Sequence, residues 1–198
     1  MSFKTKLVIF DLDGTLVDAY KAVSSSLNFS LNKAGLPPLS DETIKRSVGW
    51  GDRNLVSRFV PAGKVDAVLK IYRRHHKLAL KTGTKFLPHA RQILLNLKKR
   101  KYKLAVASNR PTVYTRIILK SLKAIGWFDC ILCADRVRRG KPAPDLLRGI
   151  LKKSNIAAGE AAYVGDMTID VQAGRRANIK TVAVLTGSCK RSEIAPLH

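Results

Sequence analysis

Hydrophobic residues in the first part of the chain recur mostly at helical spacing. One short apolar run, residues 7–10, precedes them and has the length of a buried strand. After it, apolar residues three and four positions apart predict one helix that ends at Gly35, one that starts near Ser40 and one that runs onward from Val65. We therefore expect residues 17–83 to form a small all-helical unit.

From residue 84 onward, short apolar runs alternate with segments of helical period. Within the first of these helices, Ile93, Leu94 and Leu97 are expected to face inward, whereas the tail 188–198 shows no clear element. The expected strands cover 103–107, 129–133, 161–164 and 181–185, and the expected helices cover 88–100, 112–123, 144–153 and 168–177. Strands separated by helices of about ten residues predict a parallel sheet covered by helices on both faces.

The predicted fold class is therefore α/β. Residues 1–16 and 84–198 would form the core domain with the parallel sheet, and residues 17–83 would be inserted after its first strand. In sheets of this kind the functional site lies beyond the carboxyl ends of the strands.

Length and composition fit one medium domain, or a core with a smaller insert, for these 198 residues. No apolar run approaches the roughly 18 residues of a transmembrane helix, and Met1 to Lys6 show no signal-peptide pattern. Three cysteines fit a reducing cytoplasm better than a disulfide framework. Cys130 and Cys133 have no second pair to complete a zinc site, so we interpret them as small apolar residues. A cytoplasmic protein without a membrane segment is expected.

The net charge is +23, from 37 Lys and Arg against 14 Asp and Glu. Such a surplus attracts anionic ligands and can bind nucleic acid without sequence preference. The basic residues are spread along the chain, mostly at predicted helix ends and faces, where cations are ordinary. We favour a solvated basic surface, and non-specific polyanion binding is the alternative.

Two carboxylates follow the first predicted strand, Asp11 directly and Asp13 two residues later, before the turn Gly14-Thr15. Side by side at the end of a buried strand, they would be costly without a cation between them. Oxygen ligands at this density suit Mg²⁺. The group supplies a nucleophile, a second carboxylate for proton transfer and a metal site. A plain Asp-Gly turn or a calcium loop is the alternative, but the chain turns apolar at residues 16–17 where a calcium loop needs further ligands.

Later strand and loop ends carry polar groups in the same way. Ser108 and Asn109 can hold a phosphate oxygen. Lys141 is followed by two prolines, Pro142 and Pro144, that fix the backbone of its loop, and Asp166 and Asp170 follow the next strand. Each alone has a simpler interpretation, as a polar turn, a solvated cation, a helix cap or a first-turn charge. Together, on successive strand ends of one sheet, they indicate a single site.

In this order, the motifs resemble those of the haloacid dehalogenase-like superfamily, and the resemblance covers nearly the whole chain. The predicted helical insert is similar to the cap of its phosphoglycolate phosphatase-like branch, and the resemblance implies a Rossmann-like core. The matching motifs are Asp11-Leu12-Asp13-Gly14-Thr15, Ser108-Asn109, Lys141 before Pro142-Ala143-Pro144-Asp145, and Gly165-Asp166 with Asp170.

The resemblance implies that Asp11 attacks phosphorus and becomes an aspartyl-phosphate. Asp13 would protonate the leaving oxygen and then activate water. The carboxylates of Asp11 and Asp166 and the backbone carbonyl of Asp13 would bind Mg²⁺, and Asp170 would support this site through water. Lys141 would offset the charge on Asp11 and the phosphate.

The phosphoryl group would be held by Ser108 and Asn109, with Leu12 and Thr15 of the first motif. Dehalogenases of the superfamily lack a carboxylate at the position of Asp13, so this residue favours the hydrolysis or transfer of phosphate esters.

Substrate choice is expected to depend on the segment 49–54 of the insert. Arg53 could reach a substrate carboxylate or a second phosphate. The alternative is a connecting loop with a packing Trp50 and a capping Asp52. His75 and His76 lie on a basic helix and are expected at the surface.

The function expected is a Mg²⁺-dependent phosphomonoester hydrolase that acts through an aspartyl-phosphate on a small phosphorylated metabolite, with phosphoglycolate as the first candidate. The alternatives are a phosphomutase similar to beta-phosphoglucomutase, and a nucleic-acid-associated phosphatase or binding protein that uses the basic surface. A monomer or a homodimer is expected.

Overall fold

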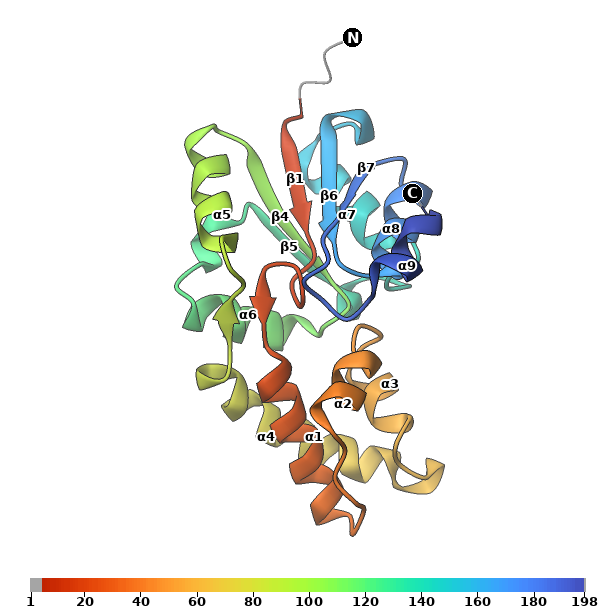
Figure 1. Cartoon of the computed structure of the whole chain (residues 1–198). Coiled ribbons are helices and arrows are strands. Elements are labelled where there is room, and N and C mark those ends of the chain that lie inside the picture. The colour runs from red at the N-terminus through yellow and green to blue at the C-terminus, as the bar shows by residue number, and fades with distance from the viewer. Residues whose placement is uncertain (1–4, 198) are drawn as a thin grey trace.

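The computed structural model describes residues 5–197. Its centre is a five-stranded sheet in the order β5-β4-β1-β6-β7, in which every neighbouring pair is parallel. The strands are β1 (Leu7–Phe10), β4 (Lys103–Ser108), β5 (Cys130–Cys133), β6 (Ala161–Gly165) and β7 (Lys180–Ala183). The predicted α/β fold with a parallel sheet is confirmed (Figure 1).

Helices cover both faces of this sheet, because alternate residues of the central strand point to opposite sides. Val8 and Phe10 of β1 pack with residues of α5 and α6, whereas Leu7 and Ile9 pack with residues of α7 and α8. The four helices are α5 (Ala90–Lys99), α6 (Thr112–Ser121), α7 (Asp145–Ser154) and α8 (Thr168–Arg176). All four residues of β1 are buried, as expected of a central strand covered on both faces.

A group of four helices lies beyond the carboxyl end of the sheet (Figure 1). It has an apolar cluster of its own, which joins Val23, Ile44, Leu55 and Leu69 from the four helices. The helices are α1 (Tyr20–Lys33), α2 (Asp41–Ser47), α3 (Asp52–Ser57) and α4 (Val65–Thr82). At the start of α2, the Ser40 hydroxyl accepts a hydrogen bond from the backbone N–H of Thr43, which is an N-cap. We keep 17–83 as the proposed limits of this helical unit.

The chain passes between the sheet and the helical unit through a short antiparallel ribbon of β2 (Val17–Asp18) and β3 (Lys85–Phe86). This ribbon was not predicted, because two residues per strand are too few to show a period. Helix α3 was not predicted either, since its six residues hold less than two helical turns. Short 3₁₀ turns cover Ala62–Lys64, Ile125–Trp127, Ala134–Arg136, Ala158–Glu160 and Ala195–Leu197.

Two details of the core differ from the sequence expectation. Ile93, expected to face inward, is 49% exposed, whereas the neighbouring Leu94 is fully buried. Adjacent residues on a helix point about 100° apart, so the narrow face that α5 turns to the sheet cannot include both. The tail, for which no element was expected, contains α9 (Arg191–Ile194), and Ile194 is buried. The last residue of that tail lies outside the described residues.

None of the helices within residues 5–197 combines the length and the apolar character that a membrane crossing requires. Cys130 and Cys133 lie in β5, and both are free thiols.

Candidate active site

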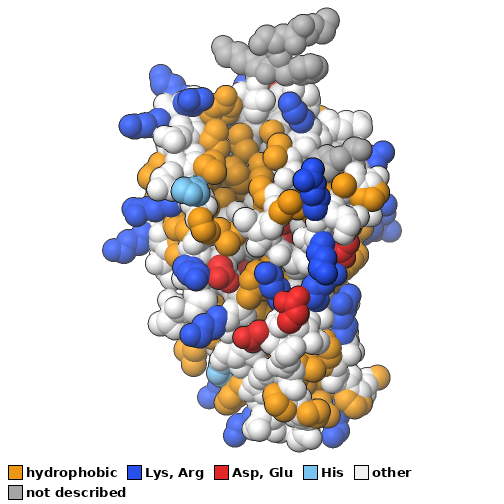
Figure 2. Space-filling view, in the orientation of Figure 1, with side chains coloured by type: hydrophobic (Ala, Val, Ile, Leu, Met, Phe, Trp, Pro, Cys, Tyr) orange, Lys and Arg blue, Asp and Glu red, His pale blue; other side chains and the backbone are white. Residues whose placement is uncertain are grey.

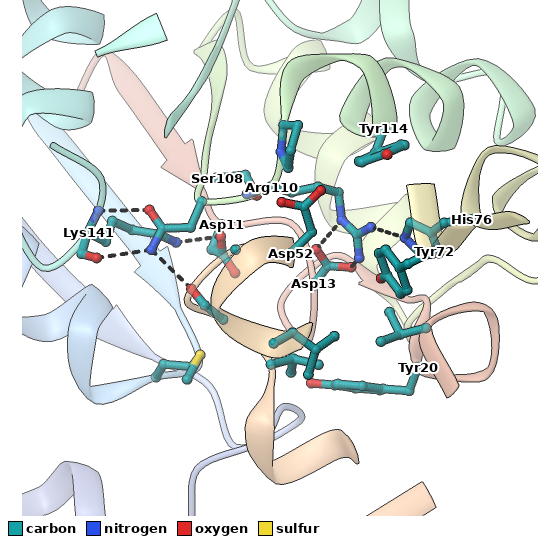
Figure 3. A pocket seen from close by; sticks show the side chains of 18 residues that line it. Asp11, Asp13, Tyr20, Asp52, Tyr72, His76, Ser108, Arg110, Tyr114 and Lys141 are labelled. Carbon is teal, nitrogen blue, oxygen red and sulfur yellow. Dashed lines mark hydrogen bonds and ion pairs between the residues drawn. The ribbon is translucent and has the colours of Figure 1, made fainter. Parts of the chain in front are cut away.

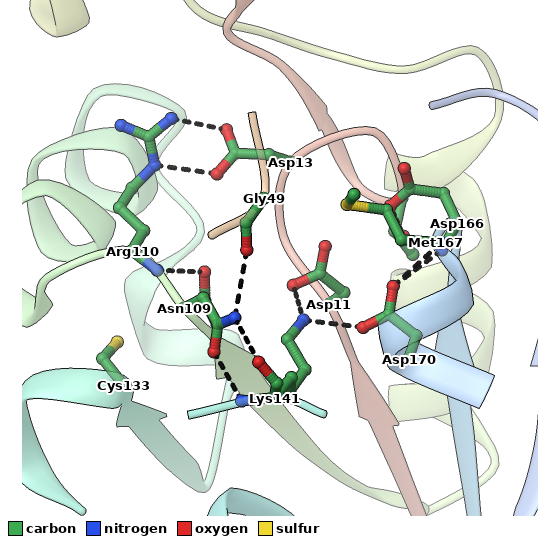
Figure 4. Close-up of polar contacts among 12 residues, drawn as sticks. Asp11, Asp13, Gly49, Asn109, Arg110, Cys133, Lys141, Asp166, Met167 and Asp170 are labelled. Carbon is green, nitrogen blue, oxygen red and sulfur yellow. Dashed lines mark hydrogen bonds and ion pairs between the residues drawn. The ribbon is translucent and has the colours of Figure 1, made fainter. Parts of the chain in front are cut away.

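The predicted motifs meet at the carboxyl edge of the sheet. Asp11 directly follows β1, Ser108 ends β4, Lys141 lies in the loop between β5 and α7, and Asp166 directly follows β6. Parallel strands place their carboxyl ends at one edge, which is why residues up to 155 positions apart converge here (Figure 4).

Lys141 is the centre of this cluster, with a side chain that is only 3% exposed. Its Nζ lies 2.5 Å from Asp11 Oδ1, 2.7 Å from Asp170 Oδ1 and 3.1 Å from the hydroxyl of Tyr163. Burial opposes the charged form, but the two carboxylates outweigh it, and the pKa of Lys141 is raised. Lys141 therefore stays a cation at any pH at which an enzyme works.

The loop that carries Lys141 is held by Asn109, as Figure 4 shows. The Asn109 Oδ1 accepts from the backbone N–H of Lys141 at 2.8 Å, and its Nδ2 donates to the Lys141 carbonyl at 3.0 Å. The same Nδ2 also lies 3.0 Å from the carbonyl of Gly49, in the helical unit. Asn109 thus fixes the loop that carries Lys141 and connects it to the helical unit, in addition to the phosphate contact predicted for it.

Three carboxylates, Asp11, Asp166 and Asp170, can each bring an oxygen within 4.8 Å of the others, and all three are buried. Burial raises the pKa of Asp11 to about 7, against the opposing attraction of Lys141. Burial and the Asp11 charge likewise raise the pKa of Asp166 well above its usual range. Asp170 accepts hydrogen bonds from Tyr163 and from the backbone N–H groups of the β6–α8 turn.

This cluster fits Mg²⁺. Within residues 5–197, the three carboxylates face one ammonium group, that of Lys141, which leaves two negative charges uncompensated when all are ionised. A divalent cation balances that charge, and a set of oxygen donors is the kind that Mg²⁺ prefers. The side chain of Asp13 does not belong to the cluster, so only its backbone carbonyl remains available to the metal site.

Close backbone packing brings Asp166 to its position. Gly14 has φ +81°, and a Cβ on it would lie 2.6 Å from Asp166 Oδ2, while a Cβ on Gly187 would collide with the same carboxylate. Thr15 Oγ1 donates to Asp166 Oδ1 at 3.0 Å, and the backbone N–H of Ser188 lies 3.2 Å from Oδ2. The Thr15 side chain therefore holds Asp166.

Leu12 and Thr15 were predicted among the phosphate-binding residues. Neither side chain lines the pocket that the other motif residues share, and Leu12 is fully buried. The assignment of these two positions to phosphate binding stays a prediction.

Arg110, which was not predicted, holds the second carboxylate of the first motif. Its Nε lies 2.7 Å from Asp13 Oδ2 and its Nη2 lies 2.8 Å from Oδ1, which is a bidentate ion pair (Figure 4). Burial opposes the guanidinium charge, but Asp13 outweighs it, and the pKa of Arg110 is raised. A sequence signal existed, because Arg110 directly follows Ser108-Asn109 on a strand end already assigned to the site.

His76 was expected at the surface, and that expectation is wrong, because its side chain is fully buried. Its Nε2 lies 2.7 Å from Arg110 Nη1, and its ring stacks on that of Tyr72. Burial, with the Arg110 charge, lowers the pKa of His76 to about 2, so the ring is neutral. Its spacing of four from the buried Tyr72 and Leu80 was the available signal.

Arg53, the predicted substrate contact, is not brought to this pocket. Its Nη1 lies 2.6 Å from Asp66 Oδ1, and its side chain is 61% exposed. Helix α3 begins at Asp52, so one residue later the side chain points away from the sheet. Trp50 is also exposed rather than packed, and Asp52 is paired with Arg73.

The pocket lies between the sheet edge and the helical unit. Three tyrosines, Tyr20, Tyr72 and Tyr114, line the pocket on the side of Asp13 and Arg110 (Figure 3). The residues that line it are Asp11, Asp13, Tyr20, Val23, Val48, Gly49, Gly51, Asp52, Leu55, Tyr72, His76, Ser108, Asn109, Arg110, Pro111, Tyr114, Lys141 and Met167. The sheet edge therefore supplies mostly charged and polar residues to the pocket, and the helical unit supplies mostly aromatic and apolar ones.

Comparison with known proteins agrees with this arrangement. The family model described as haloacid dehalogenase-like hydrolase matches residues 8–184. The chain is 30% identical to the phosphoglycolate phosphatase of Aquifex aeolicus (strain VF5) over 191 residues, which cover 96% of this chain and 90% of that one. It is 32% identical to the phosphoglycolate phosphatase of Rhodospirillum rubrum over 203 residues, which cover 97% and 84%.

Among solved structures, the crystal structure of a predicted phosphoglycolate phosphatase from Haemophilus somnus 129pt superposes with a TM-score of 0.91. The match covers 98% of this chain and 91% of that one at 24% identity, and at that level it shows the shared fold.

Proposed function

The chain belongs to the haloacid dehalogenase-like hydrolase family and is a phosphatase of that family, and from this premise we propose that it is a Mg²⁺-dependent phosphomonoester hydrolase for a small phosphorylated metabolite. Phosphoglycolate is the first candidate substrate, since relatives matched over most of the chain carry that name. The observation that carries the proposal is the buried cluster in which Lys141 joins Asp11 to Asp170 beside Asp166.

In the proposed reaction, a carboxylate oxygen of Asp11 attacks phosphorus, and the bond from phosphorus to the substrate's alcohol oxygen breaks. Asp13 gives its proton to that oxygen, so the alcohol leaves neutral. Asp13 then takes a proton from water, which attacks the aspartyl-phosphate and releases phosphate with Asp11 restored. The Lys141 ammonium beside Asp11 offsets the negative charge of the transferred group.

The metal would be held by the carboxylates of Asp11 and Asp166 and by the carbonyl of Asp13, with Asp170 in support. Bound there, Mg²⁺ would supply positive charge to the phosphoryl oxygens and orient them. Ser108 is 98% buried at the end of β4, and its Oγ accepts from the backbone N–H of Arg110. Its hydroxyl proton is therefore free to donate to a phosphoryl oxygen.

We further propose that residues 17–83 act as a cap that opens and closes over the cluster. Tyr20, Val23, Val48 and Leu55 come from this segment and line the same pocket as Asp11. The ribbon of β2 and β3 is the covalent connection between the two parts, so it is where a closing movement would bend.

The test is phosphate release with and without Mg²⁺ from phosphoglycolate, sugar phosphates and nucleoside monophosphates. The Asp11→Asn variant should abolish release, while Asp41→Asn, an exposed residue at the start of α2, should retain it. Transfer of phosphate between positions of a sugar, without release, would identify a mutase instead. No release from any compound by folded protein with Mg²⁺ would contradict the proposal.

A further inference from the structure

Arg110 is the cation best placed to meet a second negative charge on a substrate. Among the described residues that line the pocket, only Arg110 and Lys141 are cationic, since His76 is held neutral. Lys141 is 3% exposed and is occupied by two carboxylates. Arg110 is 11% exposed and pairs with the more open Asp13, which is 23% exposed.

The geometry of Arg110 suits a carboxylate. Its Nε and Nη2 donate hydrogen bonds to the two oxygens of Asp13 at 2.7 and 2.8 Å. The same pair of parallel N–H groups can bind a carboxylate of a ligand. A guanidinium has five N–H groups, and Arg110 uses two for Asp13 and one for His76. Within residues 5–197 the two remaining N–H groups, one on Nη1 and one on Nη2, have no hydrogen-bond partner. They can therefore bind a ligand while the Arg110 guanidinium exchanges Asp13 for that ligand.

His76 sets the position of Arg110 from the helical unit. The Ser26 hydroxyl donates to the carbonyl of Ala22 at 2.6 Å, so its oxygen can accept from His76 Nδ1, 3.1 Å away. A neutral ring with its proton on Nδ1 has an acceptor at Nε2, and this acceptor lies 2.7 Å from Arg110 Nη1. Figure 3 shows Arg110 held between Asp13 and His76.

We propose that Arg110 is a specificity-determining residue that binds a carboxylate of the substrate, with His76 as its positioning residue, and that this exchange frees Asp13 for proton transfer. The inference deepens the proposed function and rests on it. In the structure both Asp13 oxygens accept from Arg110, so each keeps only one further acceptor site for the leaving oxygen. A substrate carboxylate replaces that of Asp13 in the ion pair, and the freed Asp13 carboxylate takes from solvent the proton that it then gives to the leaving oxygen.

The first test compares phosphoglycolate with ethyl phosphate, which has no carboxylate, as substrates of the native protein, Arg110→Gln and Arg110→Lys. The ratio of the two kcat/KM values should fall on the order of 10- to 100-fold in Arg110→Gln, as loss of a charged hydrogen-bonded pair predicts. Arg110→Lys should be intermediate, because an ammonium lacks the fork. The loss should appear in kcat as well as in KM. An equal fall for both substrates would overturn the proposal.

The second test concerns His76. His76→Phe keeps a ring against Tyr72 but has no acceptor, so it should lower the same ratio, while His76→Gln should restore much of it through its amide oxygen. Lys77→Gln, at an exposed position on the same helix, is the matched control and should keep the native ratio. If His76→Phe does not fold, His76→Leu takes its place. A native ratio in a folded variant without an acceptor would refute the positioning role.

A third test separates this inference from the proposed function. Calorimetric titration of the Asp11→Asn protein, which cannot turn over, compares the binding of the two compounds with and without Arg110→Gln. Tighter binding of phosphoglycolate that Arg110→Gln removes would support the inference even where the native protein releases no phosphate. Equal binding of the two compounds before that substitution would overturn it, whatever the activity.

Discussion

At the scale of single residues, the site is a balance of buried charges. Asp13 is paired with Arg110 and Asp11 and Asp170 share Lys141, whereas Asp166 accepts hydrogen bonds from Thr15 and the backbone N–H of Ser188. Burial and the repulsion between neighbouring carboxylates raise the pKa of Asp11 and of Asp166 as long as no divalent cation is bound. Stability and metal binding should therefore be linked through these side chains.

The raised pKa of Asp11 makes the metal-free protein sensitive to pH. Burial raises the pKa of this carboxyl from its ordinary value of 3.8 to about 7 in the fold. A carboxyl whose pKa is higher in the folded than in the unfolded state binds protons more tightly when the protein is folded. Its contribution to the free energy of unfolding is therefore fully present below pH 4 and is lost as the pH rises to 7. We expect the free energy of unfolding to fall over that range by up to about 4 kcal/mol relative to Asp11→Asn. Urea unfolding of both proteins in EDTA at a series of pH values measures this fall. With Mg²⁺ present, the free energy of unfolding of the two proteins should depend on pH in the same way.

Replacing Lys141 should destabilise the protein because two buried carboxylates lose their shared partner. We expect Lys141→Met to lower the free energy of unfolding by about 3–5 kcal/mol at neutral pH, as well as to abolish phosphate release. Lys98→Met, on the exposed face of α5, is the control and should cost under about 1 kcal/mol. Urea unfolding of the metal-free proteins checks this, and equal stabilities would contradict the central place given to Lys141.

At the scale of elements, loops from distant parts of the chain close the site. The turn after β1 and the loop after β7 meet at Asp166, where Gly14 and Gly187 leave room for its carboxylate. On the other side, Arg46 of α2 donates to the carbonyl of Ser188 at 2.6 Å and pairs with Glu193 of α9. The loop 184–190 therefore contacts both Asp166 and the helical unit.

A side chain at position 187 should disturb the metal site. A Cβ there would collide with the Asp166 carboxylate, so Gly187→Ala must displace either that carboxylate or the loop that carries residue 187. We expect the Mg²⁺ concentration for half-maximal phosphate release to rise roughly 10- to 100-fold, as for other residues that orient metal ligands. Gly159→Ala is the control, since no atom lies within 4 Å of its added Cβ. Unchanged Mg²⁺ dependence in Gly187→Ala would contradict the role given to this close packing in placing Asp166 for the metal.

At the scale of the whole molecule, the surplus of basic residues is spread along the chain and over the face of the molecule in view. Figure 2 shows Lys and Arg side chains scattered across the visible face, over the core and the helical unit alike, with no single dominant patch. With a net charge of +23, the folded chain repels itself. This spread supports the interpretation of a solvated basic surface, and polyanion binding stays an alternative.

Salt should therefore stabilise the protein. Raising NaCl from 0.02 to 0.2 M shortens the screening distance from roughly 20 Å to under about 10 Å and weakens the repulsion. We expect the thermal midpoint to rise by a few degrees, about 1 kcal/mol in free energy. An equal osmolality of a neutral sugar serves as the control for general solvent effects. A midpoint that falls with salt would show that attractive ion pairs outweigh the net charge.

The sequence by itself determined the elements and the chemistry of the strand ends. Strands and helices followed from local periods, and parallel strands necessarily bring Asp11, Ser108, Lys141 and Asp166 to one edge of the sheet. Short elements without a period, such as the ribbon of β2 and β3, could not be predicted in this way.

Only the tertiary structure decided what faces the pocket from outside the motifs. Arg110 meets Asp13 across 97 positions and His76 across 34, and such pairs depend on how α4 packs and turns on the sheet. The same packing buries His76 and directs Arg53 outward. A local pattern records the period of a helix but not which neighbour its faces meet, because that is set by contacts between segments distant in the chain.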